Sequence, residues 1–192
     1  ISGPGVYRSD RYPEAYAGAA FIPEPAANAV TCHWFKETEK GLGRATHQLF
    51  QDKNFEKREF LCSTDERFRP VSIYNGPDGC IYVVDLYRGI LQHKVYVTSF
   101  YLKPYILERK LEVPVGMGRI YRIVYKAKGR NKTQPKLQNA SVEELVKTLS
   151  HPNGWWRDTA QRLLVERRDK KSIPALQKVI KSAENYLAKV HA

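Results

Sequence analysis

Short apolar runs separated by Gly- and Pro-containing turns fill the first two thirds of the chain. The runs are rich in β-branched and aromatic residues, a composition that is typical of β-strands. They cover residues 19–22, 29–35, 58–62, 70–74, 81–85 and 119–125. Strand, tight turn, strand, loop and strand in succession predict an antiparallel meander. Because the pattern recurs at about 40–50 residues, it favours the blades of a β-propeller.

Two connections between these runs stand out. Gly76-Pro77-Asp78-Gly79 is a tight-turn sequence in which Pro77 suits a central position and Asp78 serves the turn. The second connection runs from Asp85 to Arg119, too long for a structureless loop, so we expect it to fold over other residues or to carry function. Within it, residues 99–111 predict a short helix interrupted by Pro104.

The pattern becomes helical after residue 126. Residues 127–139 are polar and without periodicity, which indicates a linker between residues 1–126 and residues 140–192. Ser141 and Glu144 have capping-box spacing, and residues 155–168 predict a second helix. A third helix is expected from Ser172, as its cap, through Leu187. Helix, turn and helix at this pitch predict the start of an α-solenoid.

Charge adds an asymmetry to this division. The net charge is +12, of which residues 127–192 supply +8 (14 Lys and Arg against 6 Asp and Glu). A solvated helical face explains this excess, and so does an acidic partner or an anionic surface. No nucleic-acid-binding motif accompanies the charge, so we do not expect nucleic acid as a partner. No run of 18 apolar residues occurs, so no transmembrane segment is expected.

The three cysteines, Cys32, Cys62 and Cys80, carry little functional signal. None belongs to a CxxCH motif, so this chain has no covalent haem site. Each lies in an apolar or strand-like context, and we expect buried, inert thiols. Cysteine usage leaves the cellular compartment open.

Several strings resemble a known family. FRPVSIYNGPDGCIYVVDLYRG followed by GRIYRIVY resembles the last blade of glucose/sorbosone-dehydrogenase-like propellers. Together with STDERFRPV and LSHPNGWWRDTAQRLLVER, they are similar to PVC-type putative membrane-bound dehydrogenases, large secreted bacterial proteins. The likeness extends from about Gly3 to Leu176.

The resemblance implies a β + α fold class: a partial β-propeller of about two antiparallel blades, followed by α-helical HEAT-like hairpins. It implies oxidation of a sugar or alcohol with pyrroloquinoline quinone (PQQ) and calcium in the full-length protein. It also implies a secreted or periplasmic location and electron transfer to a cytochrome c module or partner. Because the chain begins at Ile1 without Met, we expect it to be a piece whose remaining blades lie elsewhere in a parent protein.

Blade topology predicts where the chemistry lies. Residues 23–28, 63–69 and 87–118 are expected on one face, where propellers hold their ligands. Asp65 and His93 are the candidate catalytic residues, since a carboxylate or imidazole removes a hydroxyl proton. The other candidates divide by chemistry into cofactor-binding Arg67, Arg69, Tyr87 and Arg88, and substrate-binding Glu24 and Asn28. No metal ligand is assigned.

Structural roles compete with these functional ones. Arg69 is also suited to pair with Asp65 or Asp85, and the aromatic residues of the long loop are suited to pack it onto the blade. Trp155 and Trp156 fit a solenoid core as well as a sugar ring. At the level of the whole chain, a non-catalytic glycan- or protein-binding scaffold is the alternative to a dehydrogenase.

Overall fold

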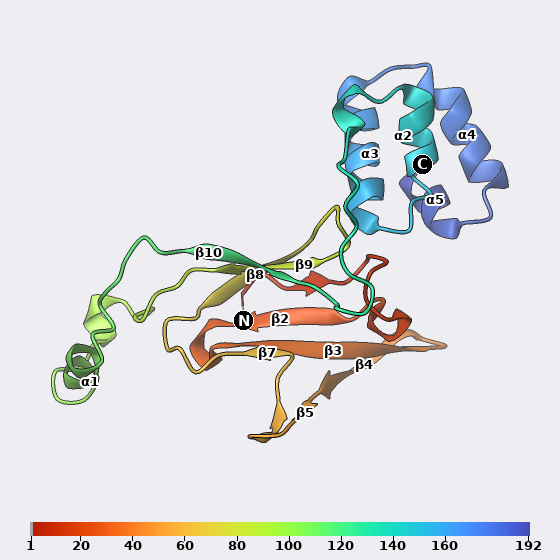
Figure 1. Cartoon of the computed structure of the whole chain (residues 1–192). Helices are drawn as coiled ribbons and strands as arrows, with labels where there is room; N and C mark the ends of the chain where they lie inside the picture. Colours follow the sequence, from red (N-terminus) through yellow and green to blue (C-terminus); the bar gives the residue numbers. More distant parts are fainter. Residues whose placement is uncertain (1) are drawn as a thin grey trace. The chain divides into compact units, whose positions relative to one another are not determined.

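The computed structural model describes residues 2–192, without the side chains of Glu37 and Leu42. The chain forms two compact units, each built from separate segments. Unit 1 comprises Ile1–Tyr7, Gly18–Tyr74 and Ile81–Ile123, and unit 2 comprises Arg8–Ala17, Asn75–Cys80 and Val124–Ala192. The expected combination of antiparallel sheets and helices is confirmed at the level of a β + α fold (Figure 1).

The larger sheet of unit 1 has five strands. Its order is β1 (Gly5–Val6), β2 (Ala20–Glu24), β3 (Ala29–Thr38) and β4 (Gly41–Gln48), and β7 (Leu61–Cys62) also pairs with β3. All these pairings are antiparallel. A separate hairpin pairs β5 (Phe50–Asp52) with β6 (Glu56–Arg58). The core of this sheet includes the fully buried side chains of Phe21, Val30 and Cys32.

A second sheet of unit 1 has the order β10 (Arg119–Ile123), β9 (Ile81–Asp85) and β8 (Pro70–Asn75). Strands β9 and β10 pair antiparallel although the long loop separates them in sequence. That loop contains the 3₁₀ helix η3 (Lys94–Tyr96) and α1 (Leu102–Glu108). Pro104 lies in the first turn of α1, where its missing N–H costs no helical bond, so the predicted interruption is wrong.

The hairpin between β3 and β4 was not expected from the sequence. Strand β4 reads GLGRATHQ, which shows no apolar alternation, and its residues with described side chains are mostly exposed. Its pairing with β3 therefore rests on backbone hydrogen bonds more than on burial. The predicted strand over residues 58–62 is likewise split, because residues 59 and 60 separate β6 from β7.

Unit 2 is helical. It holds α2 (Val142–Thr148), α3 (Gly154–Arg167), α4 (Ser172–Ser182) and α5 (Tyr186–His191), with the 3₁₀ helices η1 (Glu14–Tyr16) and η4 (Leu137–Asn139). The expected capping box at Ser141 is present, and the predicted inward residues of α2 and α3 form the core, including Leu145, Leu149 and Leu163.

The third predicted helix needs correction. It ends at Ser182, and Asn185 caps a new helix, α5, through its side chain. Ser172 is the first helical residue and donates to the carbonyl of Asp169 instead of capping. Ile180, predicted to be buried, is 50% exposed. Asn is a preferred N-cap residue, so Asn185 indicated the start of a new helix. The apolar helical pattern continues past residue 182 and hid this boundary.

The sequence HPNGWWRD, residues 151–158, anchors two remote segments of unit 2. The Asn153 side chain, 1% exposed, donates to the carbonyls of Gly76 and Pro77 at 3.0 and 3.3 Å. Trp156 Nε1 donates to Pro77 O at 2.9 Å, and Gly154 N donates to Arg8 O at 2.7 Å. The turn predicted at residues 76–79 is confirmed by the hydrogen bond from Gly79 N to Gly76 O. The conspicuous motif therefore serves packing.

Candidate functional site

The three loop segments predicted to share a face of the blades do converge within unit 1. Asn28 adopts a left-handed conformation, with φ of 54°, and its side-chain amide donates to Phe68 O at 2.7 Å. Its carbonyl accepts from Ser63 N at 3.1 Å. These bonds join residues 23–28 to residues 63–69. We call the converged surface of residues 23–28, 63–69, 85–89 and 105–119 the rim.

Arg69 is the main clamp of the rim. Its guanidinium donates to the carbonyl oxygens of Pro25, Arg88 and Gly89 at 2.7, 2.8 and 2.9 Å. Burial lowers the pKa of this guanidinium. Three of its five N–H donors are thus engaged by backbone. The structure gives Arg69 a structural role, and its cofactor-binding role stays a prediction.

Arg67 acts in the same way on the long loop. Its Nε donates to Val113 O at 3.0 Å, and its Nη2 donates to the carbonyls of Arg109 and Lys110 at 3.2 and 2.9 Å. Carbonyls at the end of α1 lack intrahelical partners, so a guanidinium there satisfies groups that are otherwise open. Arg67 therefore joins the segment that follows α1 to residues 63–69.

Two carboxylate–tyrosine pairs lie on the rim. Tyr87 donates its phenol proton to Asp65 Oδ2 at 2.9 Å, and Arg119 stacks over the Tyr87 ring at 3.6 Å from its centroid. Tyr105 donates to Glu66 Oε1. The bonds to Asp65 and Glu66 raise the pKa of Tyr87 and of Tyr105, respectively. Both phenols therefore stay protonated at neutral pH and act as hydrogen-bond donors.

Glu66 also has a cationic neighbour, Arg109. Arg109 Nη1 lies 2.8 Å from Glu66 Oε1, and its guanidinium also covers the Tyr105 ring at 4.5 Å. The second carboxylate oxygen of Glu66 has no hydrogen-bond partner among the described residues, whereas Asp65 also accepts from Arg67 N. Of the two carboxylates, Glu66 has the oxygen that is open to a ligand.

Asp85 is the buried carboxylate of the rim and accepts hydrogen bonds from its backbone. It is 1% exposed, and its Oδ1 accepts from Arg69 N at 2.7 Å and from Tyr87 N at 2.8 Å. Its Oδ2 is buried without a hydrogen-bond partner among the described residues. This carboxylate holds Tyr87 in its left-handed conformation, with φ of 49°. Its signal in the sequence was a charged residue at the end of an apolar strand.

The other predicted residues have separate settings. His93 is exposed and its Nδ1 accepts from Val95 N, capping η3. Arg88 is exposed, and its side chain has no partner among the described residues. Glu24 ends β2 and precedes the 3₁₀ helix η2 (Pro25–Ala27). No interaction among the described residues joins His93 to Asp65, so the two predicted catalytic groups are not brought into one hydrogen-bonded pair.

The cysteines follow the expectation in two of three cases. Cys32 and Cys80 are buried, and burial, with a smaller effect of Glu59, raises the pKa of Cys32 to about 12. Cys62 is exposed, which corrects the prediction for that residue. It lies in the two-residue strand β7, too short to be covered on both faces.

Comparison with known proteins identifies a family for the part of the chain that contains the rim. Residues 1–127 match the family model of a domain of unknown function, DUF7133. The chain belongs to this family. The DUF7133 match contains every residue of the rim and ends before η4 and α2, the first helical elements that follow it. No curated protein and no solved structure matches the chain.

Two further observations concern membrane-spanning helices and metal ligands. Over residues 2–192, no helix combines the length and apolar character that crossing a membrane requires. Among the same described residues, no three His, Cys, Asp or Glu side chains gather as a candidate metal site.

Proposed function

We propose that the chain contributes the last blades of a dehydrogenase-like β-propeller, followed by HEAT-like hairpins, and that its rim contacts a sugar or alcohol. The convergence of three loops onto one hydrogen-bonded rim carries the proposal. Carboxylates and arginines bind hydroxyl groups, and tyrosine faces pack against sugar rings. The antiparallel strands before and after the rim loops support the blade assignment.

Alcohol oxidation removes a hydroxyl proton and a hydride equivalent. The open oxygen of Glu66 favours this residue over Asp65 and His93 as the base that takes the proton. Tyr87 and Tyr105 donate to the carboxylates and keep them oriented. Arg88, whose side chain is exposed and unengaged among the described residues, is suited to bind a substrate hydroxyl or an anionic group.

The quinone cofactor implied by the resemblance would accept the hydride when bound. Its carboxylates would have Arg88 and the two remaining donors of Arg69 as partners in this chain. Calcium takes six to eight oxygen ligands, and no group of three His, Cys, Asp or Glu side chains that could hold a metal ion lies among residues 2–192. No step of the proposal passes through calcium. A secreted location and a cytochrome c partner belong to the same proposal.

The test separates binding from turnover. The full chain is titrated calorimetrically with sugars and alcohols, and dye reduction is followed with added quinone and calcium. Glu66→Gln should keep sugar binding and lower dye reduction by about 100-fold or more, since the amide cannot accept the proton. Arg88→Ala should weaken binding, whereas the exposed control Arg44→Ala should not. Absence of binding to every sugar and alcohol would sink the proposal.

A non-catalytic binding scaffold is the second candidate. It is favoured by the engagement of Arg67 and Arg69 with backbone carbonyls, which assigns them to architecture. In that case sugars bind, no dye is reduced under any condition, and Glu66→Gln leaves the protein's activity profile unchanged. The same two measurements thus decide between the candidates.

A further inference from the structure

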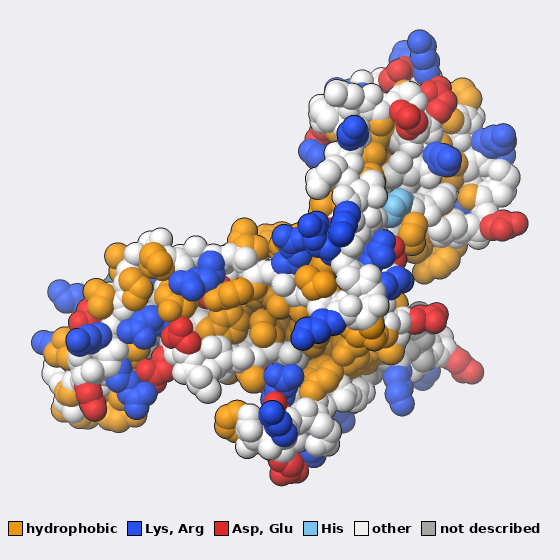
Figure 2. All heavy atoms as spheres, in the orientation of Figure 1, with side chains coloured by type: hydrophobic (Ala, Val, Ile, Leu, Met, Phe, Trp, Pro, Cys, Tyr) orange, Lys and Arg blue, Asp and Glu red, His pale blue; other side chains and the backbone are white. Residues whose placement is uncertain are grey.

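The segment between the last strand and the helices of unit 2 is strongly basic. No acidic residue occurs between Glu112 and Glu143. The segment carries five exposed cations: Lys126, Lys128, Arg130, Lys132 and Lys136. Lys128 donates to Asp10 O at 2.5 Å, a carbonyl that leaves its charge uncompensated. Figure 2 shows blue Lys and Arg side chains gathered where this segment runs in unit 2.

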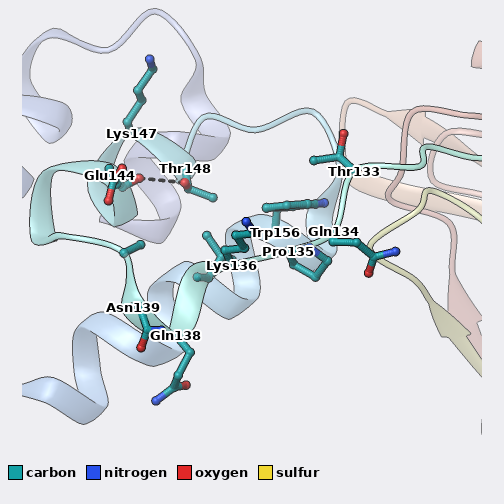
Figure 3. Close-up of a pocket in the computed structure, with 12 residues that line it drawn as sticks. Thr133, Gln134, Pro135, Lys136, Gln138, Asn139, Glu144, Lys147, Thr148 and Trp156 are labelled. Atoms are coloured by element: carbon teal, nitrogen blue, oxygen red, sulfur yellow. Dashed lines mark hydrogen bonds between the residues drawn. The ribbon is translucent and has the colours of Figure 1, made fainter.

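A groove of about 850 Å³ adjoins this basic segment. One wall is residues 133–140 and the other is α2, with Trp156 of α3 between them (Figure 3). Lys136 lines the groove, and Lys147 extends from α2 into solvent (Figure 3). Every residue of the groove belongs to unit 2.

The hydrogen-bonding state of the groove favours an acceptor-rich ligand. The guanidinium of Arg167 already donates hydrogen bonds to the carbonyl oxygens of Leu137, Gln138 and Ala140. Glu144, the acidic residue of the lining, is locked in the capping box by Ser141 N at 2.7 Å. The polar side chains without a partner among the described residues are two ammonium groups, three amides and one hydroxyl, from Lys136, Lys147, Gln134, Gln138, Asn139 and Thr133.

We infer that this groove binds an extended acidic segment of a partner protein. Carboxylates of the segment pair with Lys136 and Lys147, and the amide side chains both donate to and accept from its backbone. The apolar groups of Pro135 and Ala140 contact an aliphatic side chain.

Nucleic acid and glycans fit the groove less well than peptide. Bases and sugar rings bind on exposed aromatic faces. The aromatic side chain of this groove, Trp156, is 9% exposed, and its ring is stacked with His151 at 5.0 Å. Trp156 therefore forms part of the groove wall and offers no exposed face for stacking. The amide side chains of the same groove can hydrogen-bond to a peptide backbone.

Fluorescence anisotropy of the full chain with a labelled Asp/Glu-rich peptide carrying one Leu tests the inference. Binding should weaken between about 0.05 M and about 0.3 M NaCl, as charge pairing at an exposed site requires. The double variant Lys136→Glu, Lys147→Glu should weaken binding by about tenfold or more. The matched control Lys170→Glu, Lys189→Glu has the same charge change outside the groove and should lose less than about threefold.

Three competing results would overturn the inference. Equal loss in the two double variants means that net charge alone attracts the peptide. Equal or tighter binding of a DNA oligonucleotide or a polyuronate assigns the basic segment to another class of polyanion. No anisotropy change at about 0.05 M NaCl removes the site altogether. Circular dichroism of both variants confirms that a loss of binding is not a loss of folding.

Discussion

In both the rim of unit 1 and the HPNGWWRD anchor of unit 2, polar side chains hydrogen-bond to backbone carbonyls. The two regions differ in how much of the hydrogen-bonding capacity of these side chains is used. In both, a polar side chain collects carbonyl oxygens from segments far away in sequence. In the anchor, Asn153 is buried, and both its amide nitrogen and its amide oxygen are hydrogen-bonded to protein groups, although Nε of Arg157 in the same motif is buried without a partner among the described residues. In the rim, Arg69 and Glu66 keep donor or acceptor capacity, and Asp85 keeps a buried oxygen without a partner among the described residues.

This difference separates architecture from candidate chemistry. A buried polar group whose hydrogen bonds are complete stabilises one conformation and has nothing left for a ligand. A partly satisfied group stays available, or signals a missing partner. The comparison therefore predicts that substitutions in the anchor change folding, whereas those on the rim divide between folding and binding.

The largest effect is expected at the anchor. Asn153→Ala removes the donors to Gly76 O and Pro77 O and the N-cap of α3, and should lower the free energy of unfolding by about 3 kcal/mol. Urea unfolding followed by tryptophan fluorescence, to which Trp34, Trp155 and Trp156 contribute, measures it. Asn185→Ala is the matched control, an exposed Asn cap worth about 1 kcal/mol. Equal losses for the two variants would contradict the special status of the anchor.

Much of this architecture could be predicted from the sequence, but few of its hydrogen bonds could. The strands at residues 70–75 and 81–85, the capping box at Ser141 and the convergence of three loops were all predictable, because periodicity and turn residues act locally. That HPNGWWRD would bind the turn at Gly76 was not predictable. Its partners lie more than 70 residues away, and no periodicity reports them.

The candidate site was predicted by region rather than by residue. Asp65, Arg67, Arg69 and Tyr87 are on the rim as expected, yet most of their hydrogen bonds go to backbone or to one another. The sequence shows which side chains are polar, but their remaining capacity depends on carbonyls whose positions only the fold determines. Glu66 was therefore passed over, although it adjoins Asp65.

The rim itself yields the second prediction. Arg69→Ala leaves three carbonyls without their donor and should lower the free energy of unfolding by about 2 kcal/mol. Arg88→Ala, at an exposed side chain, should change it by less than about 0.5 kcal/mol. Thermal unfolding of both variants gives the comparison. If Arg88→Ala lowered the free energy of unfolding as much as Arg69→Ala, the Arg88 side chain would have a structural role and would not be free to bind a ligand.

A pH effect sharpens the account of the anchor. Burial lowers the pKa of His151, whose Nδ1 accepts from Asn153 N at 3.0 Å. The unfolded chain therefore binds the proton more readily, so stability is present above the ordinary histidine pKa of about 6.5 and is lost as pH falls below it. His151→Gln should flatten this loss between about pH 7 and about pH 5.

Urea unfolding at several pH values measures that slope. His93→Gln is the control, because His93 is exposed and also caps its own turn. An unchanged slope in His151→Gln would assign the pH dependence to other groups, foremost His33 and His191, whose pKa values burial also lowers.

The smallest effect is expected at the exposed border of the anchor. Arg8 forms two hydrogen bonds with Asp158, at 2.8 and 3.0 Å, but the side chains are 43% and 49% exposed. A double-mutant cycle with Arg8→Ala and Asp158→Ala should give a coupling of about 0.5–1 kcal/mol that falls as salt is added. At about pH 8 His191, 3.8 Å from Asp158, is neutral and does not compete, since burial lowers its pKa. A coupling as large as the Asn153→Ala loss would mean that charge, rather than the buried amide, holds residues 8–17 in unit 2.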